Sequence, residues 1–489
     1  MSIDKREDDG PIIDKKDFAE DSTTTDLEGV LASVTEGGTL TQRELWGWWI
    51  WGWGVNGFGG SAQGVFIPVI LSSLAVAASF RSDDPSQPCA GAENCIVRFG
   101  TMNVSPASFS LFNQGLAIAF QVVTFIQLGA IGDHGNYRKH LLFGCSLISQ
   151  ICCLLFIAVD STGYQLAGII NIIANVFWGA SWVFATSYLP LFAMLSPQVK
   201  RARQEGVPLH ELVRVEQEVM SHISGRLILI AYTGGTVCFL IAAGAVLALR
   251  QTTYSLQVAT AIGGGWWVTF GAVSWFLLTS RPSPPLPAGE NYLTYPWKRL
   301  YRSLKTGHRL PDMTTILIAN FFFSDARHTT ISLAVLFAQF ELKASNAILI
   351  VAAIVVNAVG ALTIPCWRLL QRQLKLHSKT IIMTVVITYT ILPAYILLGF
   401  IPGSPIGLKS TTEFIIIASY LGFVNGAQDY IMRSVFAETV PRGHESEMFG
   451  LFALTGQSGS WMGPLIVGKC FGDFRCIRDD TFHLARVIF

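Results

Sequence analysis

The run NAILIVAAIVVNAVGALTIPC, residues 346–366, contains no Asp, Glu, Lys or Arg. A helix needs roughly 20 predominantly apolar residues to cross the hydrocarbon core of a bilayer, so this run is long enough to span it once. Ten further long apolar runs follow the same pattern along the 489-residue chain. The sequence therefore predicts an all-α polytopic membrane protein with eleven spans, near residues 48–76, 108–131, 140–159, 166–193, 227–249, 256–279, 313–340, 346–366, 381–401, 413–436 and 448–467.

The composition also excludes an ordinary soluble domain. Hydrophobic residues make up 51% of the chain and charged residues only 14%, and the mean hydropathy is +0.45. Soluble domains carry charge at about a quarter of their positions. The formal net charge of +1 gives no signal by itself, because membrane proteins encode their orientation in where Lys and Arg lie.

The distribution of basic residues predicts the orientation. If the first 44 residues lie in the cytosol, the cytosolic connections hold eighteen Lys and Arg residues, whereas the opposite loops hold five. Short cytosolic loops are enriched in Lys and Arg. We therefore expect a cytosolic N-terminus and a first loop that faces a lumen or the outside.

The chain divides into two sets of spans. Residues 1–44 are polar and are predicted to be a disordered cytosolic tail without a cleavable signal peptide. Residues 45–280 are predicted to form an N-terminal six-helix bundle, and 281–312 a basic cytosolic linker with six prolines. We interpret the linker's basic residues as a topology signal and a contact for anionic lipid, and we expect no nucleic-acid partner. Residues 313–468 are predicted to form a C-terminal helical bundle, followed by an atypical tail at 469–489.

Six spans, a basic linker and a further set of spans is the layout of the major facilitator superfamily, whose two halves are repeats about an axis along the membrane normal. The sequence predicts such a two-bundle fold. A full fold has twelve spans, and no twelfth helix fits the charged residues after Val467. We therefore expect an incomplete second bundle, such as a truncated or misread gene model would leave.

The connection between the second and third spans, GAIGDHGNYRK at residues 129–139, resembles the signature loop of that superfamily. The resemblance implies a cytosolic gate in which Gly129 and Asp133 lie beside the basic pair Arg138 and Lys139. The loop departs from the signature by one extra residue before the pair, and by His134 at a position that is usually basic. The alternative is an ordinary basic turn at the membrane interface.

Several stretches together narrow the family. Residues 426–450 read GAQDYIMRSVFAETVPRGHESEMFG, and residues 460–464 read SWMGP. With shorter stretches in the fourth, fifth and seventh spans, they resemble the autophagy-related protein 22 family of fungal vacuolar amino-acid effluxers, over about residues 44–468. The resemblance implies a vacuole membrane protein that exports leucine and other neutral amino acids to the cytosol after autophagic degradation.

An acidic side chain within a span is a candidate site, because an ionised carboxylate in hydrocarbon is unfavourable unless it is paired or hydrated. Asp325 lies near the middle of the seventh span, and His328 follows one turn later. Asp325 is a candidate proton or substrate-ammonium site, and His328 can shuttle a proton because imidazole titrates near neutrality. The alternatives are a structural salt bridge between Asp325 and Arg327 or a neighbouring helix, and a packing role for His328.

The tenth span ends with further charges. Asp429 and Arg433 are four residues apart on one helical face, so they are able to pair within the helix. The functional interpretation instead turns Asp429 toward a substrate cavity and places Arg433 in a cytosolic gate with Glu438 and Glu445. Protons are a further candidate partner.

Neutral amides inside the spans are candidates for hydrogen bonds to an amino acid's carboxylate or ammonium group. Asn56 and Gln63 on the first span and Asn175 on the fourth span are the main candidates, followed by Asn113, Gln121, Asn171, Asn357 and Gln457. The alternative for each is a hydrogen bond between helices. The first span also carries six glycines between residues 52 and 64, which would allow close backbone approach or a break at a substrate site.

The first lumenal loop contains Cys89 and Cys95, for which a disulfide or two free thiols are both open. Its Asn103 begins an Asn-Val-Ser glycosylation sequon.

The sequence does not favour an enzyme. The residues 52–57 match the spacing of a dinucleotide-binding fingerprint, but they lie inside a membrane span with no preceding strand. Cys and His show no usable metal-ligand spacing, so we expect neither metal nor cofactor. The alternatives to an amino-acid transporter are a non-transporting membrane scaffold or enzyme that aids breakdown of autophagic bodies, and a major-facilitator permease for another small solute.

Overall fold

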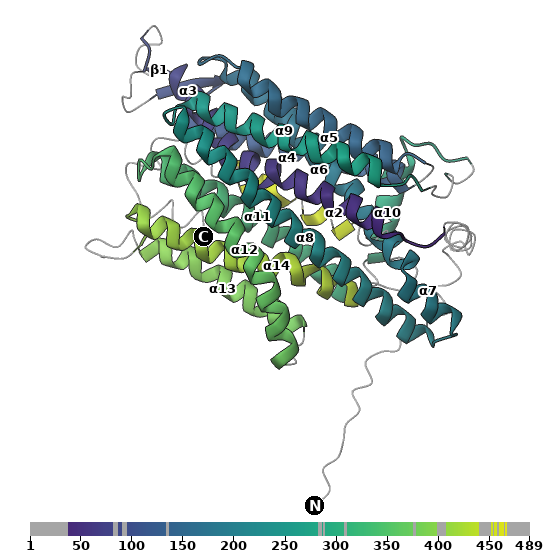
Figure 1. The fold of residues 1–489 in the computed structure, drawn as a ribbon. Helices are drawn as coiled ribbons and strands as arrows, with labels where there is room; N and C mark the ends of the chain where they lie inside the picture. Colours follow the sequence, from purple (N-terminus) through teal and green to yellow (C-terminus); the bar gives the residue numbers. More distant parts are fainter. Residues whose placement is uncertain are drawn as a thin grey trace, which may run out of the picture.

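A computed structural model describes most of the chain. The described residues are 38–81, 87–89, 95–133, 136–281, 286, 289–307, 311–374, 378–398, 407–439, 451–452, 454–456, 459–463 and 465–466. In this part of the chain, long helices lie side by side and form one bundle (Figure 1). A three-stranded antiparallel sheet containing β1 lies at one end of the bundle and α7 at the other.

The first part of the chain supplies six predicted spans. The first of these is continuous but changes helix type twice: α2 (Gln42–Asn56), η1 (Gly57–Phe66) and α3 (Ile67–Ala77). The others follow as α4 (Pro106–Asp133), α5 (Arg138–Leu155) with η2 (Phe156–Ala158), α6 (Tyr164–Leu195), the short α7 (Pro197–Gln204), α8 (Leu209–Ala248) and α9 (Thr253–Leu277). The strands are β1 (Phe80–Arg81), β2 (Cys95–Phe99) and β3 (Met102–Val104).

The second part begins with α10 (Tyr295–Gly307), which lies in the predicted linker. It continues with α11 (Pro311–Phe340), α12 (Asn346–Leu374), α13 (Ser378–Leu398), α14 (Thr411–Thr439) and the short η3 (Gly459–Trp461). Ten of the eleven predicted spans fall on helices, and the eleventh, 448–467, is described only in pieces. The predicted all-α polytopic fold is confirmed.

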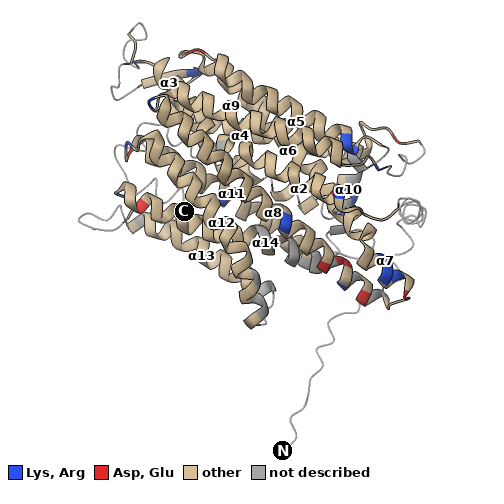
Figure 2. Cartoon of the chain, in the orientation of Figure 1, with Lys and Arg blue, Asp and Glu red and all other residues tan. Residues whose placement is uncertain are grey.

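Apolar length identifies the membrane-crossing helices most directly. Among the described residues, six helices are long and apolar enough to cross a membrane: Gln42–Ala77, Pro106–Gly129, Arg138–Ala158, Tyr164–Leu195, Arg214–Ala248 and Asn346–Trp367. Most Lys, Arg, Asp and Glu residues of the described chain lie toward the two ends of the bundle, and few lie in its middle (Figure 2). Outward-facing residues such as Leu147 (52% exposed) and Ile151 (48% exposed) on α5 are apolar, as a lipid-facing surface requires.

The helix ends are fixed by specific contacts. Thr41 caps α2 in a reciprocal pair with Glu44, whose side chain accepts the backbone N–H of Thr41. Glu44 is buried and forms an ion pair with Arg281 at 2.8 Å. Because Arg281 follows the end of α9, this pair ties the beginning of the first span to the end of the sixth.

The glycine-rich part of the first span forms the π-helix η1 rather than a break. A Cβ on Gly57 would lie 2.7 Å from Trp266 Cδ1, and one on Gly59 would lie 2.8 Å from Trp178 Cζ2. The missing side chains therefore allow two indole rings to pack directly on the helix backbone. Single-turn π segments often mark functional sites, and this longer one borders the cavity described below.

Candidate functional site

A cavity of about 550 Å³ lies inside the bundle. Its described lining comes from both parts of the chain. The first part contributes α2, η1, α4, α6 and α8, and the second contributes α10, α11, α12, α14 and the residues Leu451, Phe452, Leu454 and Gly456. Toward the end of the bundle away from the sheet, the cavity extends to Gly129 of α4 and to Pro296 and Leu300 of α10. A cavity of this size accommodates a small solute.

Asn56 joins the two parts of the chain at the cavity wall. Its Nδ2 donates to Ala231 O of α8 at 2.9 Å and to Asn357 Oδ1 of α12 at 3.3 Å. Two glycines leave room for this contact, because a Cβ on Gly235 would lie 2.6 Å from Asn56 Nδ2 and one on Gly60 would lie 3.2 Å from Asn357 Oδ1. Asn56 therefore makes the hydrogen bond between helices that was the alternative, and its role in binding a substrate stays a prediction.

Two more amide pairs face the cavity. Gln63 Nε2 donates to Gln114 Oε1 at 3.0 Å, and Gln121 Nε2 donates to Asn175 O at 2.9 Å and to Asn175 Oδ1 at 3.1 Å. All four residues line the cavity. Their side chains are neutral amides, so they can form hydrogen bonds with the polar groups of a solute without favouring a solute of either net charge.

Among the amide and indole side chains that line the cavity, five buried polar atoms have no hydrogen-bond partner within the described part of the chain. They are Gln63 Oε1, Asn175 Nδ2, Trp178 Nε1, Asn425 Oδ1 and Gln428 Oε1. Buried polar groups in proteins are almost always hydrogen-bonded, so unpaired ones call for an explanation. A polar ligand in the cavity would supply the missing partners.

Polar side chains of the seventh predicted span lie in two places, some at the cavity and one beside Gly463. Ser324, Arg327 and His328 line the cavity, and Arg327 Nη2 lies 3.5 Å from His328 Nε2. Asp325 instead accepts a hydrogen bond from the backbone N–H of Gly463, beside η3, at 2.9 Å. Among the described lining residues Asp325 does not occur, so its role as a proton or ammonium site stays a prediction.

The predicted gate is described only in part. The Arg138 guanidinium lies 5.6 Å from the centre of the Tyr188 ring, and Lys139 Nζ lies 4.4 Å from the centre of a Trp275 ring. Asp133 belongs to α4, and Asp429, Arg433 and Glu438 belong to α14, but their side chains are outside the description, and Glu445 lies outside the described residues. The gate therefore remains a prediction.

The sheet end of the bundle is joined by hydrogen bonds between the two parts of the chain. Ser72 Oγ of α3 donates to Gln339 Oε1 of α11 at 2.9 Å, and Gln339 Nε2 donates to Ser73 Oγ at 3.3 Å. Nearby, Asn346 Nδ2 donates to Gln251 O at 2.7 Å. These contacts hold the helices together on the side opposite α10.

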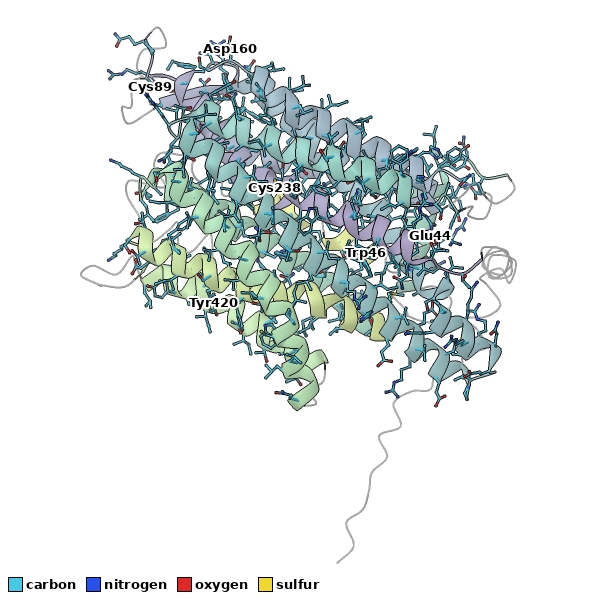
Figure 3. The ribbon with its side chains drawn as sticks, in the orientation of Figure 1. Glu44, Trp46, Cys89, Asp160, Cys238 and Tyr420 are labelled. Carbon is cyan, nitrogen blue, oxygen red and sulfur yellow. A yellow bond between two sulfur atoms is a disulfide. The ribbon has the colours of Figure 1, made fainter. Side chains whose placement is uncertain are left out.

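The loop at the sheet end contains the two remaining predicted features. Cys89 and Cys95 are joined by a disulfide with a Cα–Cα distance of 5.7 Å. Cys89 lies at the opposite end of the bundle from Glu44 (Figure 3). Asn103 lies in β3 and is exposed, so the sequon is accessible.

Several cavity residues lie outside the sequence prediction, among them Trp178, Asn425 and Gln428. The rule that selected Asn175, a polar group inside a span, applies equally to Asn425 and Gln428. The opposite case is Asn171, which does not line the cavity among the described residues and donates to Asn113 Oδ1 at 2.7 Å between helices.

A helical bundle whose two parts enclose a polar cavity is the architecture of a secondary membrane transporter. The fold is similar to that of the xylose transporter XylE from E. coli, solved in a partially occluded inward-open conformation. The TM-score is 0.52 at 11% sequence identity, and the match covers 91% of this chain and 94% of that one. The protein thus has a multi-pass helical fold of the major-facilitator type.

Sequence comparison specifies the family. The family model described as "Vacuole effluxer Atg22 like" matches residues 40–485, and the chain belongs to this family. It is 28% identical to autophagy-related protein 22 of Neurospora crassa, covering 92% of this chain and 70% of that protein. It is 29% identical to autophagy-related protein 22 of Botryotinia fuckeliana, covering 92% and 78% respectively.

Proposed function

We propose that this transporter exports leucine and other neutral amino acids from the vacuole to the cytosol after autophagic degradation. The observation that carries the proposal is the set of neutral amides around the cavity, among them Asn56, Gln63 and Asn175. A zwitterion has no net charge but needs hydrogen-bond donors for its carboxylate and acceptors for its ammonium group, and amides supply both. The vacuole and the direction of export are supported by membership of the effluxer family.

The proposed orientation places the N-terminus and α10 on the cytosolic side, as the bias of basic residues indicates. The cavity then extends toward the cytosol, and the sheet end with its disulfide faces the vacuole lumen. The predicted division into bundles at 45–280 and 313–468, joined by the linker, belongs to this proposal. A tag inserted at Gly289 should be accessible from the cytosol, and labelling only from the lumen would overturn the orientation.

The proposal is tested by efflux of labelled leucine from vacuolar membrane vesicles with and without the protein. We expect faster leucine efflux when the protein is present. Equal rates would show that leucine is not a substrate, and selective efflux of another small solute would favour a different permease. Impaired breakdown of autophagic bodies with unchanged amino-acid flux would favour the scaffold.

Proton coupling is proposed as a second property of the same transporter. Asp325 is the candidate group because it is the acidic residue within the seventh predicted span, and His328 of the same helix lines the cavity. The contact between Asp325 and Gly463 links α11 to the segment beside η3. A change of charge at Asp325 would alter that contact.

A further inference from the structure

Four of the five unpaired polar atoms named above lie on two helices, α6 and α14, and the fifth, Gln63 Oε1, lies on η1. On α6, Asn175 Nδ2 and Trp178 Nε1 are both N–H donors, whereas on α14, Asn425 Oδ1 and Gln428 Oε1 are both carbonyl acceptors. Asn175, Asn425 and Gln428 are 1%, 4% and 6% exposed, and all four residues line the cavity. One wall therefore offers donors, and another offers acceptors.

The amide of Asn175 is held in this orientation by its neighbour. Gln121 Nε2 donates to Asn175 Oδ1, which leaves Nδ2 as the free end of the side chain. Gln121 reaches Asn175 because residue 179 is glycine, and a Cβ there would collide with the Gln121 amide and lie 2.6 Å from Phe125 Cζ. The donor on α6 is thus positioned by the packing of α4 against α6.

The other groups are positioned by close packing as well. The Trp178 ring packs on Gly59, where a Cβ would lie 3.1 Å from its Nε1. Asn425 and Gln428 are three residues apart, so they share one face of α14. Gly426 fixes the rotation of that face, because its missing Cβ would lie 2.6 Å from Gly360 O of α12.

Carboxylates only accept hydrogen bonds, and ammonium groups only donate them. We infer that the cavity binds a neutral amino acid in one orientation, with its carboxylate on Asn175 and Trp178 of α6 and its ammonium group on Asn425 and Gln428 of α14. The inference rests on the proposed function and adds the orientation of the substrate. One bound molecule then links a helix before α10 in the sequence to a helix after it.

The rest of the lining suits an aliphatic side chain. Ile417, Ala418 and Leu421 of α14 and Val356 of α12 line the same cavity. Arg327 of α11 is the rival site for the carboxylate, because a guanidinium binds carboxylates strongly. It lies close to His328 and takes part in further contacts, so the experiment must separate Arg327 from the α6 donors.

The test uses the same substitution chemistry at the two proposed ends. Binding of labelled leucine, leucinamide, which lacks the carboxylate, and isocaproate, which lacks the ammonium group, is measured on the purified full-length chain. Asn175→Asp replaces a donor by a negative charge, so leucine should bind about 10-fold more weakly or worse while leucinamide is spared. Gln428→Glu places a negative charge beside the ammonium group, so leucine should bind more tightly and isocaproate more weakly.

One further variant tests the second proposed donor, and another is the matched control for a charge buried on α6. Trp178→Phe keeps a ring but removes the N–H, and it should weaken leucine several-fold without affecting leucinamide. Asn171→Asp places the same charge on α6 at a side chain that is 0% exposed and contacts Asn113 instead of the cavity. It should leave the ratio of leucine to leucinamide affinity unchanged, and size-exclusion chromatography reports whether each variant is folded.

The outcomes separate the orientation from the function. If Gln428→Glu weakens leucine and Asn175→Asp does not, the orientation is the reverse of the one inferred. If Arg327→Gln removes the preference for leucine over leucinamide and Asn175→Asp leaves it, the carboxylate lies on α11. Equal shifts in Asn175→Asp and Asn171→Asp also overturn the inference. In each of these cases leucine binding by the unsubstituted chain preserves the proposed function, whereas a chain that binds no neutral amino acid overturns both.

Discussion

Two sets of glycines in this transporter serve different purposes. Between α12 and α14, glycines face backbone: a Cβ on Gly422 would lie 2.5 Å from Val356 O, and one on Gly426 would lie 2.6 Å from Gly360 O. Around the cavity, glycines face side chains: Gly59 meets the Trp178 ring, and Gly179 meets the Gln121 amide. The first set brings two helices together, and the second makes room for the groups that face the cavity. Glycine at a helix contact therefore does not by itself indicate a substrate site.

The largest effect on stability is expected where glycines of α14 contact the backbone of α12. Gly422→Ala would force α12 and α14 apart, because the backbone of Val356 cannot turn aside as a side chain can. Overpacking of this kind costs about 1–3 kcal/mol, so we expect a lower thermal unfolding midpoint and little protein in the membrane. Gly244→Ala is the matched control, since a Cβ there meets nothing within 4 Å. Equal abundance of the two variants would contradict the distinction.

The next largest effect is expected on transport, at Asp325, which accepts a hydrogen bond from Gly463. Gly463 belongs with the glycines that face side chains, because a Cβ there would lie 3.0 Å from Thr329 Cγ2. Asp325→Asn keeps the shape and an oxygen that can accept from the Gly463 N–H, but it cannot ionise. We expect normal abundance and loss of pH-dependent transport in vacuolar vesicles. Unchanged rates at every pH would exclude Asp325 as a coupling site.

A different result would identify a structural pair at Asp325. Removing one partner of a buried ion pair leaves the other charge unpaired at a cost of roughly 3–5 kcal/mol. Such a pair with Arg327 predicts that Asp325→Asn lowers abundance rather than changing the pH profile. Expression level and flux, measured on the same vesicles, separate the two interpretations.

The smallest effect on protein abundance is expected at the cavity glycines, where a substitution should change transport instead. Gly179→Ala should displace the flexible Gln121 side chain from Asn175 and reduce leucine transport by about 10-fold, with abundance little changed. In a Gln121→Ala background the same substitution should add only the cost of displacing the Phe125 ring, because the contact between Gln121 and Asn175 is already lost. Full additivity of the two substitutions would show that Gly179 acts through something other than Gln121.

The sequence predicted the spans well because apolar length is a local property, and ten of the eleven predicted runs coincide with helices. It could not predict which amides face the cavity. Asn171 and Asn175 are one turn apart on α6, yet only Asn175 lines the cavity, since Asn113 of α4 occupies the position beside Asn171. That difference depends on how α4 packs against α6.

The sequence also could not predict contacts between segments that are far apart in the chain. Asn56 and Asn357 are 301 residues apart, and no local pattern pairs them. The six glycines of the first span indicated close approach or a break, but the choice of a π-helix depends on Trp178 and Trp266 from other helices. The direction of Asp325, toward Gly463 rather than the cavity, likewise depends on the rotation of α11.

The central claim is that the cavity between the two parts of the chain holds the transported amino acid. It is tested most directly by substrate protection of Ser332→Cys, a cavity position on α11, against a membrane-impermeant thiol reagent. The background variant carries Cys366→Ser, because Cys366 is exposed, and Cys470→Ser and Cys476→Ser, because both lie outside the described residues. The remaining free cysteines are buried. Ser280→Cys, an exposed position outside the described lining, serves as the control. The account predicts that saturating leucine slows modification at position 332 but not at position 280. Equal modification of Ser332→Cys with and without leucine, in a chain that exports leucine, would place the transport site elsewhere.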